Sequence, residues 1–233
     1  MKNMDAKDPV EAELFYRFLK EEGIGEIYRT QETPKPQANP APAAATGAKN
    51  DLLMLRDTVL KCAKCAELAA TRKSVVFGSG NVTAALMFVG EAPGYEEDVQ
   101  GLPFVGPAGQ LLTKIIESIG LERKQVFIAN VLKCRPPQNR TPQPEEILNC
   151  EPYLREQIER IKPRVLCALG TFAAQTLLKT GENISSMRGR FYDYHGAKLL
   201  CTYHPAYLLR NPGEKRKVWE DMKKIRQELG EAV

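Results

Sequence analysis

Four short runs of almost wholly apolar residues alternate with longer stretches of helical periodicity along most of the chain. The runs lie at 84–89, 125–131, 164–169 and 198–202. Strands without a polar face are buried on both sides, which is typical of parallel sheets covered by helices. The pattern therefore predicts an α/β fold of three layers, α/β/α, with a central four-stranded parallel sheet. Helices are predicted from residue 51 through Cys65, at 107–119, at 145–161, after Thr171 and after Gly213.

The N-terminal part of the chain has a different pattern. Within residues 1–32, the stretch 9–20 places apolar side chains on one helical face and predicts a short amphipathic helix. Residues 33–49 hold four prolines and many alanines without apolar periodicity, which predicts an extended linker. The folded domain is then expected at 50–233. The helix at 9–20 either docks on a protein partner or packs back on the domain, and the pattern favours neither.

The charge balance is modestly basic and uneven. The formal net charge is +4, and residues 1–50 hold seven Lys and Arg against eight Asp and Glu, so the positive excess lies in the predicted domain. Such a domain suits a polyanionic partner, although an ordinary solvated surface can have the same balance. No apolar run reaches the roughly 18 residues of a membrane span, and the N-terminal stretch lacks the pattern of a signal peptide. We therefore expect a cytoplasmic protein without membrane contact.

Distinctive residues follow the predicted strands at their carboxyl ends, where open parallel sheets place their ligand sites. The first strand is followed by the turn Gly90-Glu91-Ala92-Pro93-Gly94 and then by Phe104, which offers a flat stacking face. The second strand ends at Asn130, whose amide can pair with the polar edge of a pyrimidine. Taken singly, these residues also fit an ordinary loop, a buried Phe and a capping Asn.

The fourth strand ends at His204, one of two histidines in the chain. A His in this place can donate a hydrogen bond to an anion that develops on a leaving base. The apolar side chains after it can fill the gap that a flipped base leaves in a duplex. The other histidine, His195, lies in a Tyr-rich turn and is predicted to be surface structure.

Four segments, in this order, resemble family 4 of the uracil-DNA glycosylase superfamily: GEAPG, LPFVGPAGQLL, NVLKCRPPQNRTP and HPAYLLR. The resemblance covers residues 52–229. It implies a monofunctional DNA-repair enzyme that flips uracil out of DNA and hydrolyses its N-glycosidic bond, leaving an abasic site. Two other hypotheses remain open: a non-catalytic uracil- or nucleic-acid-binding module with the same pocket, and a nucleotide hydrolase with structural zinc.

The resemblance also implies roles for single residues. His204 would stabilise charge at a carbonyl oxygen of the leaving uracil, Phe104 would stack on the base, and Asn130 would hydrogen-bond its edge. Family 1 has a water-positioning Asp where this chain has Ala92, so we expect a dissociative mechanism in which Glu91 or Glu97 assists. The predicted substrate contacts are Gly90, Ala92, Phe104, Asn130, Leu208, Leu209 and Arg210, the last three in a loop that enters the DNA helix.

Six cysteines in a chain without an evident export signal favour metal ligands or buried thiols over disulfides. Cys62 and Cys65 form a C-x2-C pair, which alone is a weak signal. The resemblance implies that Cys62, Cys65, Cys134 and Cys150 hold a four-iron, four-sulfur (4Fe-4S) cluster with a structural role.

Two further expectations follow from the cysteine assignment. The cluster would staple the N-terminal segment to the loop after the second strand and hold Lys133, Arg135 and Arg140 beside DNA phosphates. Cys167 and Cys201 fall inside apolar strands and are predicted to be buried. The expected partner is uracil-containing DNA, single- or double-stranded, bound by a monomer.

Overall fold

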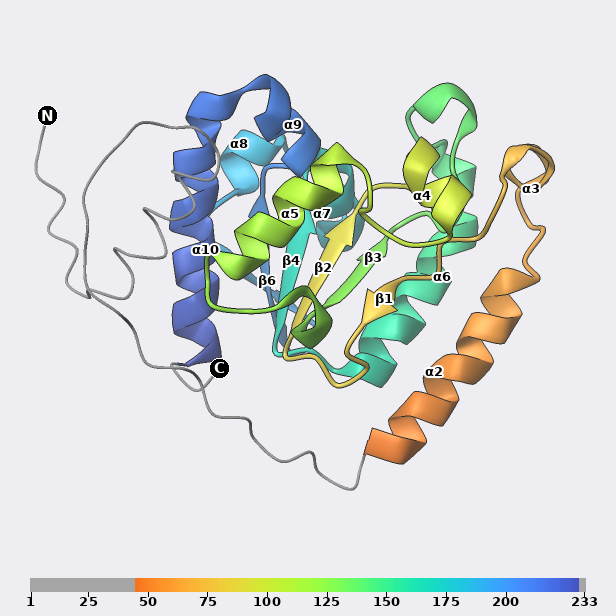
Figure 1. Cartoon of the computed structure of the whole chain (residues 1–233), viewed down its shortest axis with the longest axis horizontal. Coiled ribbons are helices and arrows are strands. Elements are labelled where there is room, and N and C mark those ends of the chain that lie inside the picture. Colours follow the sequence, from red (N-terminus) through yellow and green to blue (C-terminus); the bar gives the residue numbers. More distant parts are fainter. Residues whose placement is uncertain (1–44, 231–233) are drawn as a thin grey trace, which may run out of the picture.

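The computed structural model describes residues 45–230 (Figure 1). The helix predicted at 9–20 and the linker up to residue 44 lie outside the described residues. The first described element is the long helix α2 (Ala45–Leu60), which begins within the predicted linker. Residues 45–49 therefore belong to a helix and not to an extended segment.

A sheet of six strands forms the centre of the domain, in the order β1-β3-β2-β4-β6-β5. Its four inner strands are parallel and are the four that the sequence predicts. The prediction of a sheet with only four strands is wrong, because β1 pairs antiparallel with β3 and β5 pairs antiparallel with β6. The strands are β1 (Ser79–Gly80), β2 (Leu86–Gly90), β3 (Phe127–Asn130), β4 (Val165–Leu169), β5 (Phe191–Tyr194) and β6 (Ala197–Thr202).

The two edge strands lack the apolar run that identifies the inner strands. Strand β1 is two residues long, and β5 is half exposed along its length. Strand β5 forms a hairpin with β6 through His195 and Gly196, whose φ angles of 51° and 84° are both in the left-handed region. His195 is exposed in this turn, which confirms that it is surface structure.

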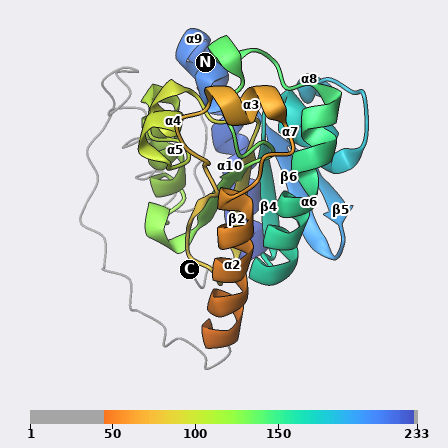
Figure 2. The ribbon, with the colours of Figure 1, turned by 90° about the vertical axis from the view of Figure 1, so that its right-hand side faces the viewer.

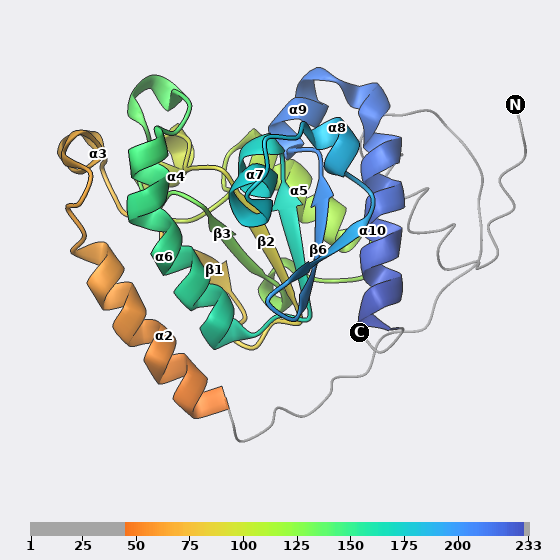
Figure 3. The same cartoon turned by 180° about the vertical axis from the view of Figure 1, so that it is seen from behind.

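Helices cover both faces of the sheet and complete the predicted three layers. Helices α5 (Pro107–Glu117), α9 (Pro205–Arg210) and α10 (Lys215–Leu229) pack on one face. Helices α2, α6 (Pro144–Ile161) and α7 (Thr171–Leu178) pack on the other. Figure 2 shows the layers from the side, and Figure 3 shows α2 and α6 side by side, with α2 on the outer side of α6.

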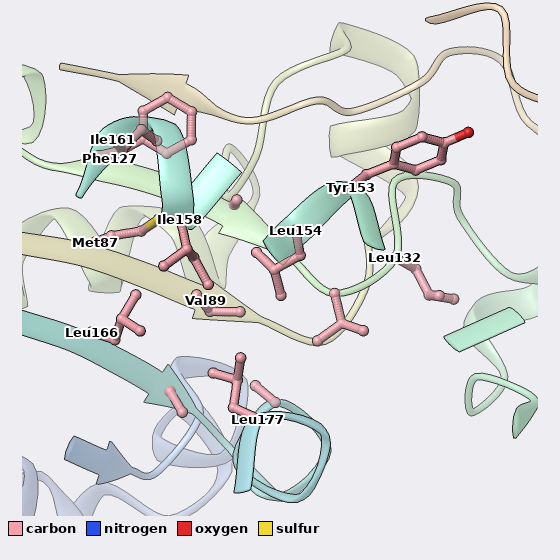
Figure 4. Packing of buried hydrophobic residues seen from close by; sticks show 14 of the residues in the cluster. Met87, Val89, Phe127, Leu132, Tyr153, Leu154, Ile158, Ile161, Leu166 and Leu177 are labelled. Carbon is pink, nitrogen blue, oxygen red and sulfur yellow. The ribbon is translucent and has the colours of Figure 1, made fainter. Parts of the chain in front are cut away.

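Alternate residues of the inner strands supply the two halves of the core. Met87 and Val89 of β2 face α6 and α7, whereas Leu86 and Phe88 face α5 and α10. Figure 4 shows the first half, in which Met87 and Val89 approach the side chains of α6 and Leu177 of α7. Because both faces are covered, the inner strands are almost wholly apolar, as the sequence pattern predicts, and their polar residues are Asn130 at the end of β3 and Lys198 and Thr202 in β6.

Besides its earlier start, helix α2 differs from the prediction at its end, near the first two cysteines. Helix α2 ends at Leu60, so Cys62 and Cys65 lie in a turn before α3 and not in a helix that runs through Cys65. No helix within residues 45–230 has the length and apolar character that crossing a membrane requires. The remaining elements are α3 (Ala66–Thr71), α4 (Tyr95–Gln100), α8 (Ile184–Met187) and the 3-10 turns η1 (Arg123–Gln125), η2 (Pro137–Asn139) and η3 (Pro212–Glu214).

Candidate functional site

A cleft of about 480 Å³ opens at the carboxyl ends of the parallel strands. Segments that follow β2, β3 and β6 form its walls, so residues far apart in the sequence meet at one edge of the sheet. The cleft is large enough for a nucleoside-sized ligand. Its lining residues are Glu91, Ala92, Pro93, Gly94, Glu97, Phe104, Ala108, Asn130, Pro136, Asn139, Arg140, His204, Ala206, Tyr207 and Arg210.

Asn130 is the last residue of β3 and presents its side chain to this cleft. The residue is 2% exposed, and its Oδ1 is a buried acceptor without a hydrogen-bond partner among the described residues. Its carbonyl oxygen accepts a hydrogen bond from Nζ of Lys133 at 2.7 Å, which fixes the backbone. A buried acceptor left free in this way is costly unless a ligand donates to it.

Phe104 forms a second wall of the cleft. Its backbone has a φ angle of 51°, a left-handed conformation that a Phe adopts only under constraint. Its ring lies beside Gly90, which has no side chain to obstruct it, and its centroid is 5.5 Å from that of His204. The ring therefore offers a fixed apolar surface beside the free acceptor of Asn130.

His204 caps helix α9 and faces the cleft. The backbone N–H of Ala206 donates to its Nδ1 at 3.1 Å, so the proton of the neutral ring is on Nε2, which can act as a donor. Burial, together with the positive charge of Arg210, lowers the pKa of His204 to about 4. Gly170, after β4, lets the ring approach, because a Cβ there would lie 2.9 Å from Cβ of His204.

The two predicted carboxylates have different surroundings. Glu91 lines the cleft directly after β2, and burial raises the pKa of its carboxyl group. The oxygens of Glu97 instead accept three backbone N–H groups, from Gly94 at 3.0 Å, Val105 at 2.8 Å and Gly106 at 3.0 Å. Glu97 thus closes the loop around Phe104.

The segment predicted to enter the DNA helix divides in two. Leu208 is fully buried in the core, packed among the side chains of α5 and α10, and this position does not fit the predicted contact with a duplex. Leu209 is 45% exposed, while Tyr207 and Arg210 line the rim of the cleft. Only the outward residues of α9 are free to meet DNA.

The prediction that Lys133 contacts phosphates is wrong. Its side chain is fully buried, and Nζ donates to the carbonyl oxygen of Asn130 and, at 2.6 Å, to Oε1 of Gln157. Arg135 and Arg140 lie nearer the surface. Arg140 lines the cleft and pairs with Glu67 and Glu146, and these partners raise its pKa.

The four cysteines assigned to the cluster line one small cavity of about 20 Å³ between the turn after α2, the loop after β3 and helix α6. All six cysteines are free thiols, and Cys167 and Cys201 are fully buried in strands, as predicted. Burial raises the pKa of the Cys150 thiol to about 12. Three sulfurs accept N–H groups: Cys134 from Arg72 at 3.1 Å, Cys150 from the Lys133 backbone at 3.2 Å and Cys65 from Asn149 at 3.7 Å.

One residue beside the site carries no signal in the sequence. Arg123 donates to the carbonyl oxygen of Pro103 at 2.6 Å and reaches the Phe104 loop from a turn 20 positions later in the chain. Such a contact depends on the packing of η1 against α5, which no local pattern reveals.

Comparisons with known proteins show which family the chain belongs to. A sequence model described as the Uracil DNA glycosylase superfamily matches residues 77–223. The chain is 47% identical over 189 residues to the type-4 uracil-DNA glycosylase of Saccharolobus solfataricus, covering 77% of this chain and 87% of that protein. It is 44% identical over 180 residues to that of Archaeoglobus fulgidus, covering 74% and 90%. A type-5 uracil-DNA glycosylase of Pyrobaculum aerophilum is 31% identical, covering 66% and 82%.

Proposed function

Because this chain belongs to the uracil-DNA glycosylase superfamily, we propose that the cleft beyond β2, β3 and β6 receives a uracil flipped out of DNA. The chain is a uracil-DNA glycosylase, and it excises uracil in DNA repair. The observation that supports the place of the reaction is the free Oδ1 of Asn130 in the same cleft as Phe104 and His204.

Each of these three side chains has one task in base recognition. The N3–H of uracil would donate to Oδ1 of Asn130, and the amide N–H of Asn130 would donate to O4. The ring of Phe104 would stack on the base. The Nε2–H of His204 would donate to O2, where negative charge gathers when uracil leaves.

The bond that breaks joins C1′ of deoxyribose to N1 of uracil. Its electron pair leaves with N1, which gives a uracil anion and an oxocarbenium-like sugar. Water then adds to C1′ and loses a proton, and the base gains one, so an abasic site and free uracil result. A neutral His204 suits this path, because it can donate to the anion and stays neutral at pH 7.

Glu91 is the proposed acceptor of the proton from water. Ala92 occupies the position of the family 1 Asp and cannot position water, whereas the neighbouring Glu91 lines the cleft. The raised pKa of Glu91 makes it a stronger base than an ordinary Glu. We place Glu97 outside this step, because its oxygens are committed to backbone N–H groups.

The four thiols that line the cysteine cavity are the donor set that a 4Fe-4S cluster takes, and Cys62, Cys65, Cys134 and Cys150 would hold it. Buried thiols that accept N–H groups are suited to become thiolates when a cationic centre binds them. Within residues 45–230, no three His, Cys, Asp or Glu side chains converge as they would around a single metal ion. A cluster takes one thiolate at each of its four irons, so wider spacing suits it. When bound, it would cross-link the turn after α2, helix α6 and the loop after β3.

The proposed function is tested with a uracil-containing oligonucleotide that is incubated with the protein and then treated with alkali. Wild type should give strand cleavage at the uracil, and Asn130→Ala and His204→Ala should each lose most of it. His195→Ala is the matched control, since that histidine is exposed in the β5–β6 turn. A wild type that binds the oligonucleotide without releasing uracil would support the non-catalytic module instead.

A further inference from the structure

Phe104 is held in a conformation that its own residue type disfavours, and two charged side chains hold it from either side. We propose that Glu97 and Arg123 are positioning residues that keep the Phe104 ring in the plane where it stacks on uracil. This inference rests on the proposed function, because it concerns how the same pocket receives the base. Neither residue is assigned a chemical step.

Glu97 holds the chain on the C-terminal side of Phe104. Its Oε1 accepts the N–H groups of Val105 and Gly106, the two residues that follow the ring. Its Oε2 accepts the N–H of Gly94, at the end of the turn after β2. One carboxylate therefore joins the turn after β2 to the Phe104 loop, through charge-assisted hydrogen bonds.

Arg123 holds the chain on the N-terminal side. Its Nη2 donates to the carbonyl oxygen of Pro103 at 2.6 Å, and its Nη1 donates to Oγ1 of Thr113 in α5 at 3.2 Å. The guanidinium is partly buried, and burial lowers its pKa while the charge of Glu97 opposes that shift. Hydrogen bonds therefore hold the carbonyl oxygen of Pro103 and the N–H of Val105, the two residues on either side of Phe104.

Helix α5 lies directly beneath the backbone of Phe104 and limits the conformations that the loop can adopt. A Cβ at Gly109 would lie 1.9 Å from the carbonyl oxygen of Phe104, so the backbone of the loop rests directly on α5. With the loop in contact below and bonded on both sides, the φ angle of 51° is maintained, and this backbone places the ring beside Gly90 and His204. Because the stacking surface is already formed, binding of the base does not have to supply the conformational entropy of ordering it.

The first test is the substitution Glu97→Gln, with Glu96→Gln as the matched control. Glu96 lies on the same helix, has the same charge and is exposed. The amide that replaces the Glu97 carboxylate has one acceptor oxygen in place of two, so Gly94 or the pair Val105 and Gly106 loses its partner. We expect KM for uracil-containing DNA to rise about tenfold with a smaller change in kcat, and no change in Glu96→Gln.

The pH profile separates positioning from proton transfer. A positioning role predicts that Glu97→Gln keeps the acid limb of the profile of wild type, at a lower rate. If Glu97 instead accepts the proton of water, its replacement by Gln should remove that limb and lower kcat strongly, and this result would overturn the proposal.

A double-mutant cycle tests whether Glu97 acts through the ring. Phe104→Leu removes the flat surface and keeps most of the volume. In that background Glu97→Gln should have an effect of less than about twofold, because the group it positions is gone. If the double variant instead loses the product of the two single losses in single-turnover rate, the inference is contradicted.

Substitutions of Arg123 test the proposal independently of Glu97. Arg123→Met should raise KM, and Arg123→Lys, whose ammonium can still reach a carbonyl oxygen, should restore part of the affinity. Thermal unfolding is measured for each variant, so that loss of fold is recognised. Failure of the wild type to release uracil would reject the proposed function. If the wild type is active but the effects of Glu97→Gln and Phe104→Leu are independent of each other, only the positioning roles are rejected.

Discussion

At Gly90 the backbone passes close beside the two residues proposed to recognise the base. A Cβ added there would lie 2.4 Å from Oδ1 of Asn130 and 2.5 Å from Cζ of Phe104. Both atoms belong to buried side chains, so a methyl group at residue 90 would have to displace the amide of Asn130 or the ring of Phe104. Strand β2 therefore ends in glycine for a steric reason and not for a special backbone angle.

We expect Gly90→Ala to reduce kcat/KM for uracil excision by about 100-fold, since a displacement near 1 Å at a reacting centre has effects of this size. The measurement is single-turnover release of uracil. Gly181→Ala is the control, because a Cβ at Gly181 would meet no atom within 4 Å. Activity within about threefold of wild type would show that the pocket tolerates a shift of Asn130 or Phe104.

His204 should make stability depend on pH. Its pKa is about 4 in the folded protein against an ordinary value of 6.5, so the unfolded chain binds the proton more readily. The contribution of this neutral histidine is present above pH 6.5, decreases as the pH falls towards 4 and is then constant. The full loss is about 3 kcal/mol.

The check is urea unfolding of wild type and His204→Gln at a series of pH values. Other acidic groups titrate in both proteins, so the difference between the two curves isolates His204. We expect that difference to change between pH 6.5 and 4. A difference that is independent of pH over this range would contradict the buried neutral histidine.

The sequence predicts the meeting of Asn130, Phe104 and His204, because carboxyl ends of parallel strands share one edge of a sheet. It does not predict which way long side chains turn. Lys133 follows a strand in a basic segment, yet the depth of the loop turns it inward to Asn130 and Gln157. Leu208 is adjacent to exposed Leu209, and only the helical pitch of α9 decides which of the two is buried.

Among the elements, the inner strands and the long helices are predictable because they are apolar or periodic over several turns. The edge strands are not, since β1 is two residues long and β5 is half exposed. The start of α2 is also missed. Its first residues, 45–49, are Ala, Thr, Gly, Ala and Lys, without an apolar pattern to mark a helix.

The cysteine cavity lies where the turn after α2, the loop after β3 and helix α6 meet. Removal of one of its cysteines should therefore weaken the packing of these elements. We expect Cys134→Ala to lower the thermal midpoint by several degrees and to reduce the iron content of the purified protein. Strand β3 ends four positions before Cys134, so activity should fall as Asn130 becomes less well held.

Cys167→Ala is the matched control for this substitution. Cys167 is equally a buried thiol, but it lies within β4 and outside the cysteine cavity. The control should lose some stability and keep its iron. Equal iron content in the two variants, with full stability of Cys134→Ala, would remove Cys134 from the proposed ligand set.

At the scale of the whole molecule, the basic character of the domain should appear in the salt dependence of DNA binding. Arg210 lies at the rim of the cleft, on the exposed end of α9. We expect Arg210→Gln to weaken binding of uracil-containing and uracil-free DNA alike. The slope of log K against log salt should decrease in magnitude by about 0.9 for one lost phosphate contact.

Arg155→Gln is the control for the salt series. Arg155 lies on α6, pairs with Glu159 and is not part of the cleft. Its replacement should leave the slope unchanged. If both variants change the slope equally, the effect belongs to net charge and not to a contact at the rim.

Helix α9 connects the two ends of the proposed reaction. His204 caps its first turn and lines the cleft, while Leu209 and Arg210 end the same helix and are exposed. Six residues of α-helix are about 9 Å long, and Pro205 stiffens their start. In the proposed function, the distance between the uracil in the cleft and the duplex at the end of α9 is therefore set by the length of this helix. One residue inserted into α9 would turn Leu209 and Arg210 by about 100° while His204 stayed in place, so an intact catalytic centre would be aimed at the wrong depth of the DNA groove.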